Sequence, residues 1–170
     1  MTYWGMAEAL EALLWRVSHE EDPKQKDSAT PVVKRLSVFS LELQGNIQLA
    51  RGANDEAFRL LNQAVEKESD LGYREPPDFF RPATEELGNA YLRATEWGKA
   101  REAFSRELRD RPNGGFSLFG VAQSYALAGQ RDQAVKAYQS FLAGWQHADS
   151  DLPEVKEATA YLVSHHAGSD

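Results

Sequence analysis

The segment from Arg81 to Gln146 contains one sequence pattern twice, at a separation of 34 residues. Three parts of the pattern correspond at this separation: the motif Leu87-Gly88-x-x-Tyr91 with Val121-Ala122-x-x-Tyr125, the position Ala100 with Ala134, and the position Phe104 with Tyr138. A fixed period of this length indicates stacked supersecondary units, because each unit buries its apolar face only against its neighbours. The period therefore predicts an architecture and a mode of binding rather than a reaction.

Apolar residues at helical spacing, interrupted by turn signals, predict how the chain is divided. Thr30-Pro31 is a typical helix start, Gly52 a typical stop, and Asn54 a typical cap for the next helix. Asp151–Glu154 resembles a capping box. These signals predict a single domain over 1–170 with the following segments: a helix over 3–17, a polar loop over 18–30, a helix pair over 31–69, a proline-rich aromatic insertion over 70–81, helix pairs over 82–112 and 115–146, and a last helix over 151–165.

Small residues recur where the two helices of each predicted pair cross. Two helices approach closely only where both sides of the crossing lack bulk. A large residue four positions further along fills the space toward the neighbouring pair. These positions are Gly45, Gly88 and Ala122 on the first helices, Ala57, Ala100 and Ala134 on the second helices, and Leu61, Phe104 and Tyr138 as the large residues.

These residues resemble the tetratricopeptide repeat (TPR), whose small, aromatic and terminal proline positions they match, with Pro112 ending the middle unit. The match is strong for the units that start near Arg81 and Gly115. It is weaker for the unit that starts near Val38, since 43 residues separate that unit from the next. The resemblance implies an all-α, right-handed superhelix (solenoid) of about three helix-turn-helix repeats, with an N-terminal helix and a C-terminal capping helix. An unrelated helical bundle is the alternative.

A narrower resemblance involves Tyr73–Pro82 and Arg111–Gly120. Both segments are similar to the C-terminal part of a group of largely uncharacterised bacterial TPR proteins, which carry a proline-aromatic insertion followed by Asn-Gly-x-Ser-Leu-Phe-Gly. It implies that the helix over 3–17 is the remainder of an earlier repeat. We expect the insertion to pack on the body of the protein, and we expect unusual packing at Glu107 and Phe141, where the repeat usually has small residues.

Composition limits the classes of partner. The net charge of −7 and pI of about 5.2 disfavour nucleic acid and anionic membranes, which attract basic surfaces. The chain has no cysteine, and its sequence has neither a signal peptide nor an apolar run long enough to insert into a membrane. We therefore expect a soluble protein, favour a cytoplasmic location, and expect a neutral or basic partner.

Stacked helix pairs place their first helices along a concave groove that binds an extended peptide or a partner helix. The repeat register predicts nine groove residues: Glu42, Asn46, Glu85, Glu86, Asn89, Arg93, Phe116, Phe119 and Gln123. Asn46 and Asn89 occupy equivalent positions, and their amides offer both donors and acceptors to a bound backbone. Chaperone-binding TPR proteins clamp a carboxylate with lysines, but here those positions hold Glu42, Glu85 and Phe119. A carboxylate clamp is therefore not expected; a merely solvated helix face is the alternative.

The predicted function is that of a noncatalytic protein–protein interaction module, or scaffold. A self-associating assembly domain that pairs through exposed repeat ends is the alternative, and an enzyme is the least favoured reading. The four histidines do not share a helix face with a carboxylate, and Asn113-Gly114-Gly115 lacks the lysine and serine of a phosphate loop. The sequence thus predicts no catalytic residue, no cofactor and no metal.

Overall fold

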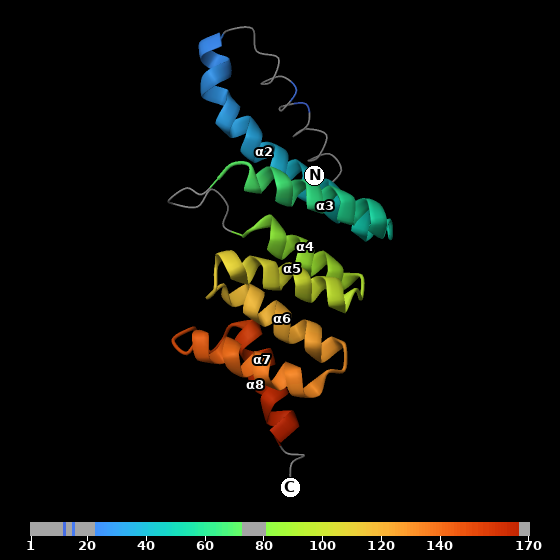
Figure 1. The fold of residues 1–170 in the computed structure, drawn as a ribbon, viewed down its shortest axis with the longest axis vertical. Coiled ribbons are helices and arrows are strands. Elements are labelled where there is room, and N and C mark those ends of the chain that lie inside the picture. Colours follow the sequence, from blue (N-terminus) through green and yellow to red (C-terminus); the bar gives the residue numbers. More distant parts are fainter. Residues whose placement is uncertain (1–11, 13–14, 16–22, 73–80, 167–170) are drawn as a thin grey trace. The chain divides into compact units, whose positions relative to one another are not determined.

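The computed structural model describes residues 12, 15, 23–72 and 81–166, and these residues form helices and turns without a strand (Figure 1). The prediction of an all-α fold is confirmed. The predicted helix over 3–17 and most of the insertion lie outside the described ranges. The helices are α2 (Pro23–Ala50), α3 (Asn54–Ser69), α4 (Ala83–Arg93), α5 (Trp97–Asp110), α6 (Gly115–Leu127), α7 (Arg131–Gly144) and α8 (Pro153–His166).

The chain forms two compact units, Met1–Ala90 and Tyr91–Asp170, and the boundary between them falls within α4. The first unit contains α2, α3 and most of α4. The second contains the end of α4 and the helices from α5 to α8. The single domain over 1–170 and the right-handed superhelix stay predictions.

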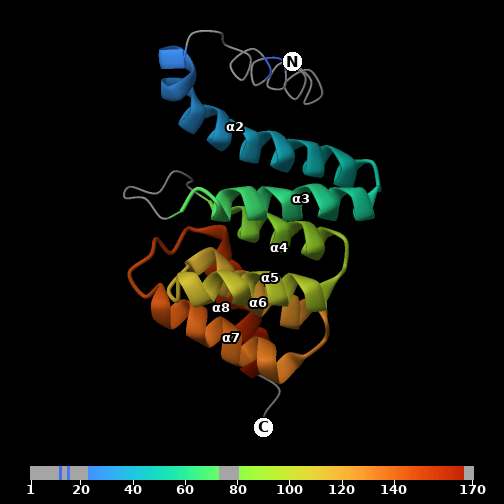
Figure 2. The same cartoon turned by 45° about the horizontal axis from the view of Figure 1, so that its top comes forward.

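Helix α2 begins at Pro23, so the predicted loop over 18–30 is wrong from this residue onward, and Thr30-Pro31 is not a helix start. Proline is well tolerated in the first turn of a helix, and the Lys24-Gln25-Lys26 segment that follows favours helix. Pro31 then lies inside α2, where it removes a backbone donor, and an internal proline bends a helix. Figure 2 shows α2 changing direction in its blue N-terminal part.

The first helix of each predicted pair ends in the same Schellman turn. The second residue after each helix takes a left-handed conformation, with φ of 77° at Gly52, 62° at Thr95 and 71° at Gly129. The next N–H then binds the carbonyl five residues earlier: Ala53 to Gln48 at 3.0 Å, Glu96 to Tyr91 at 2.9 Å and Gln130 to Tyr125 at 3.0 Å. Gly52 therefore ends α2 as predicted, and Thr95 occupies a conformation that favours glycine.

Two predicted caps are corrected by the structure. Asn54 is the first residue of α3 and does not cap it, because Ala53 holds the cap position and no side chain binds there. The Ala53 carbonyl already accepts the first helical bond from the Ala57 N–H at 3.0 Å. At α8 the first helical bond is accepted by the Leu152 carbonyl, from the Lys156 N–H at 3.0 Å. The predicted cap Asp151 instead pairs through its carboxylate with Lys156 Nζ at 2.8 Å.

The predicted crossing positions are buried. Ala57, Ala100 and Ala134 are each 0% exposed, and Leu61, Phe104 and Tyr138 are at most 1% exposed. In the first unit, α2 and α3 lie side by side as an antiparallel pair (Figures 1 and 2). A β-carbon at Gly45 would lie 2.7 Å from Leu61 Cγ and 3.3 Å from the Ala57 carbonyl oxygen. The bulk missing from Gly45 is therefore what allows this pair to approach so closely.

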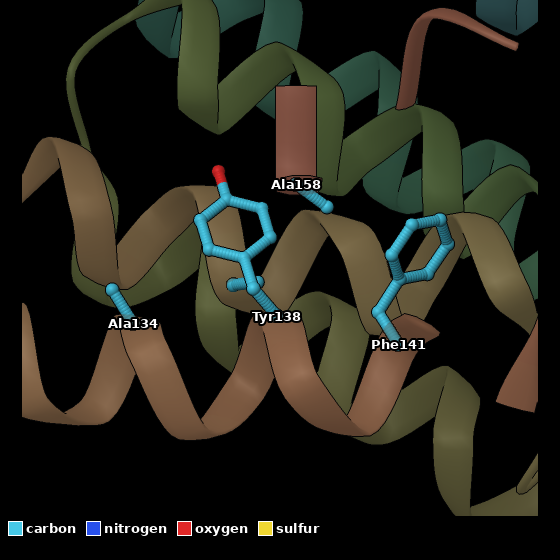
Figure 3. Close-up of a cluster of buried hydrophobic side chains, with 5 residues drawn as sticks. Ala134, Tyr138, Phe141 and Ala158 are labelled. Atoms are coloured by element: carbon cyan, nitrogen blue, oxygen red, sulfur yellow. The ribbon is translucent and has the colours of Figure 1, made fainter. Parts of the chain in front are cut away.

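In the second unit the space left by Gly120 in α6 is filled by the Phe104 ring of α5. The α6–α7 pair then shares one apolar cluster with α8, in which Ala158 lies between the rings of Tyr138 and Phe141 (Figure 3). The unusual packing expected at Phe141 is an aromatic contact, since this buried ring meets Phe119 edge to face at 5.4 Å. The second departure, Glu107, is also buried, and its carboxylate pairs with Arg111 at 3.2 Å.

We predict that Thr95→Gly stabilises the protein by about 0.5–1 kcal/mol, because relief of the left-handed strain of a β-branched residue exceeds the entropy cost of glycine. Gly129→Thr, at the equivalent turn, is the reciprocal variant and should be destabilising. Urea unfolding of both variants measures the effect. A loss of stability in Thr95→Gly would contradict it.

Gly120→Ala should destabilise the protein by about 1–3 kcal/mol, because the added methyl group meets the buried Phe104 ring at 2.5 Å. Gly98→Ala is the matched control: it also adds a methyl group to a helical glycine, but apart from the adjoining residues and the helix's own backbone no atom lies within 4 Å of the added β-carbon. The control should be neutral or slightly stabilising. Thermal unfolding compares the two, and equal effects would contradict the packing argument.

Candidate functional site

Three glutamates from three successive helices of the first unit interact electrostatically. They are Glu42 of α2, Glu68 of α3 and Glu86 of α4, called here the acidic cluster. Arg81, just before α4, offsets part of this charge, and its guanidinium lies 3.8 Å from the Glu86 carboxylate. Two of the predicted groove residues, Glu42 and Glu86, are therefore brought into one electrostatic environment.

Glu68 positions α4 within this cluster. Its carboxylate accepts a hydrogen bond of 2.6 Å from the N–H of Ala83, the first residue of α4. A carboxylate at this end of a helix also interacts favourably with the helix dipole. The end of α3 and the start of α4 are thereby joined, and Glu86 is held one turn into α4.

The environment of Glu42 raises its pKa from 4.5 to about 7. The main cause is burial, which disfavours the charged carboxylate, and the charges of Glu86 and Glu68 act in the same direction. Arg81 opposes these effects only in part. Glu42 is therefore about half ionised at neutral pH, unlike an ordinary surface glutamate.

The other predicted residues of the first unit differ in how well they suit a contact surface. Asn46 donates from Nδ2 to the Glu42 carbonyl at 2.9 Å, so one of its amide donors is used within α2. Asn89 is half-buried on α4. Glu85 is only 5% exposed, which does not suit its predicted place on an open groove. Glu42, Glu86 and Asn89 are thus the best candidates in this unit.

In the second unit the predicted residues have separate environments. Arg93 is exposed at the end of α4, whereas the partly exposed Phe116 meets the Trp145 ring edge to face at 5.4 Å. Phe119 packs on Tyr138 at 5.9 Å between ring centroids. Gln123 donates to the Glu157 carboxylate of α8 at 3.2 Å. The structure therefore uses Phe119 and Gln123 in internal packing.

Sequence reasoning missed Glu68, Arg81 and Glu157 as parts of these environments. Glu68 and Arg81 flank the insertion, where the repeat register gives no correspondence between positions. Glu157 does carry a signal, because it follows Gln123 by 34 residues, which continues the period into α8. Its bond to the Tyr138 hydroxyl at 3.2 Å had no counterpart in the sequence pattern. Burial, and after it the charge of Glu157, raises the Tyr138 pKa above its usual value.

None of the helices over the described ranges combines the length and apolar content that a bilayer crossing requires. Within the same ranges, no three histidine, aspartate or glutamate side chains converge as metal ligands. The acidic cluster instead places carboxylate charge at partly buried positions on a helical scaffold.

Comparison with known proteins supports the repeat assignment. The tetratricopeptide repeat family model matches residues 116–143, which include most of α6 and α7. Such repeats generally act as noncatalytic protein-interaction modules. The chain is also similar to the transcription activator GutR of Bacillus subtilis (strain 168), with 29% identity over 134 residues. The match covers 74% of this chain and 16% of GutR, so the chain corresponds to a small part of that protein.

Ionisation of Glu42 should make stability depend on pH. Its pKa is 4.5 in the unfolded chain and about 7 in the folded one, so its contribution is full below pH 4.5 and is lost as the pH rises to about 7. Glu42→Gln mimics the protonated carboxyl. We expect it to stabilise the protein at pH 8 by about 1–2 kcal/mol, after allowance for solvent screening, and to have little effect at pH 4.5.

The matched control is Glu66→Gln, at an exposed position of α3. Urea unfolding of both variants at the two pH values measures the difference. A Glu42→Gln effect that is the same at pH 4.5 and pH 8 would show that the carboxyl does not titrate in this range.

Proposed function

We propose that the chain is a noncatalytic protein-interaction module whose first unit binds a basic segment of a partner through Glu42 and Glu86. The observation that carries this proposal is the acidic cluster on three helices, in which the charges of Glu86 and Glu68 act on Glu42 and Arg81 offsets their effect only in part. A lysine or arginine side chain of a partner supplies the opposite charge. The TPR match supports binding of a peptide or helix rather than catalysis.

Asn89 adds a means of orienting such a segment. It lies three residues after Glu86 on the same helix, which is a spacing that places two side chains on one helix face. Its amide provides both a donor and an acceptor for a partner backbone. In this arrangement the glutamates select charge, and the amide selects an extended or helical backbone.

The similarity to a transcription activator supports, as part of the same proposal, a role in a regulatory protein. In that role the chain contacts protein rather than DNA. Its net charge of −7 opposes approach to a phosphate backbone, whose binding depends on basic side chains that displace counterions.

Selection of peptides from a random display library on the full chain tests this proposal. We expect the enriched peptides to carry excess lysine or arginine, and Glu86→Lys to weaken their binding by about tenfold or more, since a repulsive charge replaces an attractive one. Glu66→Lys makes the same charge change on an exposed part of α3 and should have a smaller effect.

Two outcomes would contradict the proposal: enrichment of acidic peptides, or equal weakening by the two lysine variants.

A further inference from the structure

The last helix, α8, covers a surface of α7 through a small set of contacts. Of its described side chains, only Ala158 is fully buried, whereas Val155, Tyr161 and Leu162 are partly buried. Glu157 Oε1 accepts hydrogen bonds from the side chains of Gln123 and Tyr138, each at 3.2 Å, and the Arg131 guanidinium of α7 donates to the His165 carbonyl of α8. A helix with so few buried side chains is expected to open at a lower free energy than the core helices.

The surface beneath α8 is rich in aromatic side chains. Tyr138 and Phe141 of α7 lie on either side of Ala158 (Figure 3), and Phe119 packs against both rings. The Trp145 ring lies tilted beside the Phe141 ring, with 5.2 Å between the centroids. Buried aromatic side chains of this kind are typical of the centre of protein–protein interfaces, and a tyrosine hydroxyl adds a directed polar contact. We call Tyr138 and Phe141 of α7, together with the adjoining Gln123 of α6, the α7 face.

We propose that the α7 face is a helix-binding site, and that α8 is its built-in, displaceable occupant. The fit of α8 specifies the chemistry of the partner: an amphipathic helix with an adjacent carboxylate and alanine, followed three residues later by an aromatic ring, as in Glu157, Ala158 and Tyr161. The carboxylate accepts from the Tyr138 hydroxyl, the alanine fits between the two rings, and the aromatic ring lies against Tyr138, as Tyr161 does at 4.8 Å.

This inference extends the proposed function, because it adds a second binding surface with a different ligand. The acidic cluster of the first unit takes a basic segment, whereas the α7 face takes a helix that carries a carboxylate. The two surfaces use different residues in different units. Either proposal therefore fails or holds without the other.

The first measurement uses the unaltered chain. Hydrogen exchange should show the amides of α8 protected at least about a hundredfold less than the buried amides of α7, since α8 opens while α6 and α7 remain paired. Equal protection of the two helices would overturn the proposal, because α8 would then be an inseparable part of the core.

The second measurement titrates a fluorescent peptide, with the sequence of residues 149–166, into full-length variants. Tyr161→Ala removes the ring that lies on Tyr138 and weakens the internal α8, so the peptide should bind this variant about tenfold more tightly than wild type, as expected when a competing closed state is depopulated. Val163→Ala is the matched control, since this side chain of α8 is 68% exposed, and it should bind the peptide as wild type does.

Adding Tyr138→Phe to Tyr161→Ala locates the binding. Loss of the hydroxyl removes the donor to the peptide carboxylate, so affinity should fall severalfold while the ring contacts remain. The proposal is overturned if the peptide binds Tyr161→Ala no better than Val163→Ala, or if Tyr138→Phe leaves its affinity unchanged.

Discussion

The close crossing of two helices at small residues is the constraint on which each helix pair depends. Gly45 leaves no room for a β-carbon against Leu61, and Ala122 and Ala134 share the corresponding apolar cluster of the α6–α7 pair. Once the backbones are this close, the large residue four positions beyond the second small one is enclosed, which explains why Leu61 and Tyr138 are fully buried. A larger side chain at the crossing would separate the helices and expose both.

The same crossing also positions the functional side chains. Glu42 and Asn46 stand three residues before and one residue after Gly45, and Phe119 and Gln123 have the same offsets from Ala122. Equivalent backbone positions thus have different uses in the two units. Glu42 joins a cluster of like charges, whereas Phe119 packs on the Tyr138 ring. Asn46 donates to a carbonyl of its own helix, whereas Gln123 binds the Glu157 carboxylate of α8. The period determines where these side chains are placed, and the local sequence determines what they contact.

Much of the fold follows from this period and was predictable. The helix over Arg131–Gly144 and the buried face of α3 agree with the predicted register, because both depend on spacing along a single helix. The start of α2 was not predictable in this way, since Pro31 is a start signal in isolation and is overridden in the folded chain. Thr95 likewise shows no local sign of its left-handed conformation, which the turn geometry imposes.

The candidate site was less predictable than the fold, because its electrostatics depend on groups without a fixed spacing in sequence. The register identified Glu42 and Glu86, but the pKa of Glu42 also depends on burial and on Glu68, which the bond to Ala83 ties to the start of α4.

The raised pKa of Glu42 has a consequence for binding. A cation that binds beside Glu42 favours its ionised form, so binding near neutral pH releases a proton. Affinity for a basic partner should therefore weaken as the pH falls below about 7, because a growing fraction of Glu42 is protonated and must lose its proton when the partner binds.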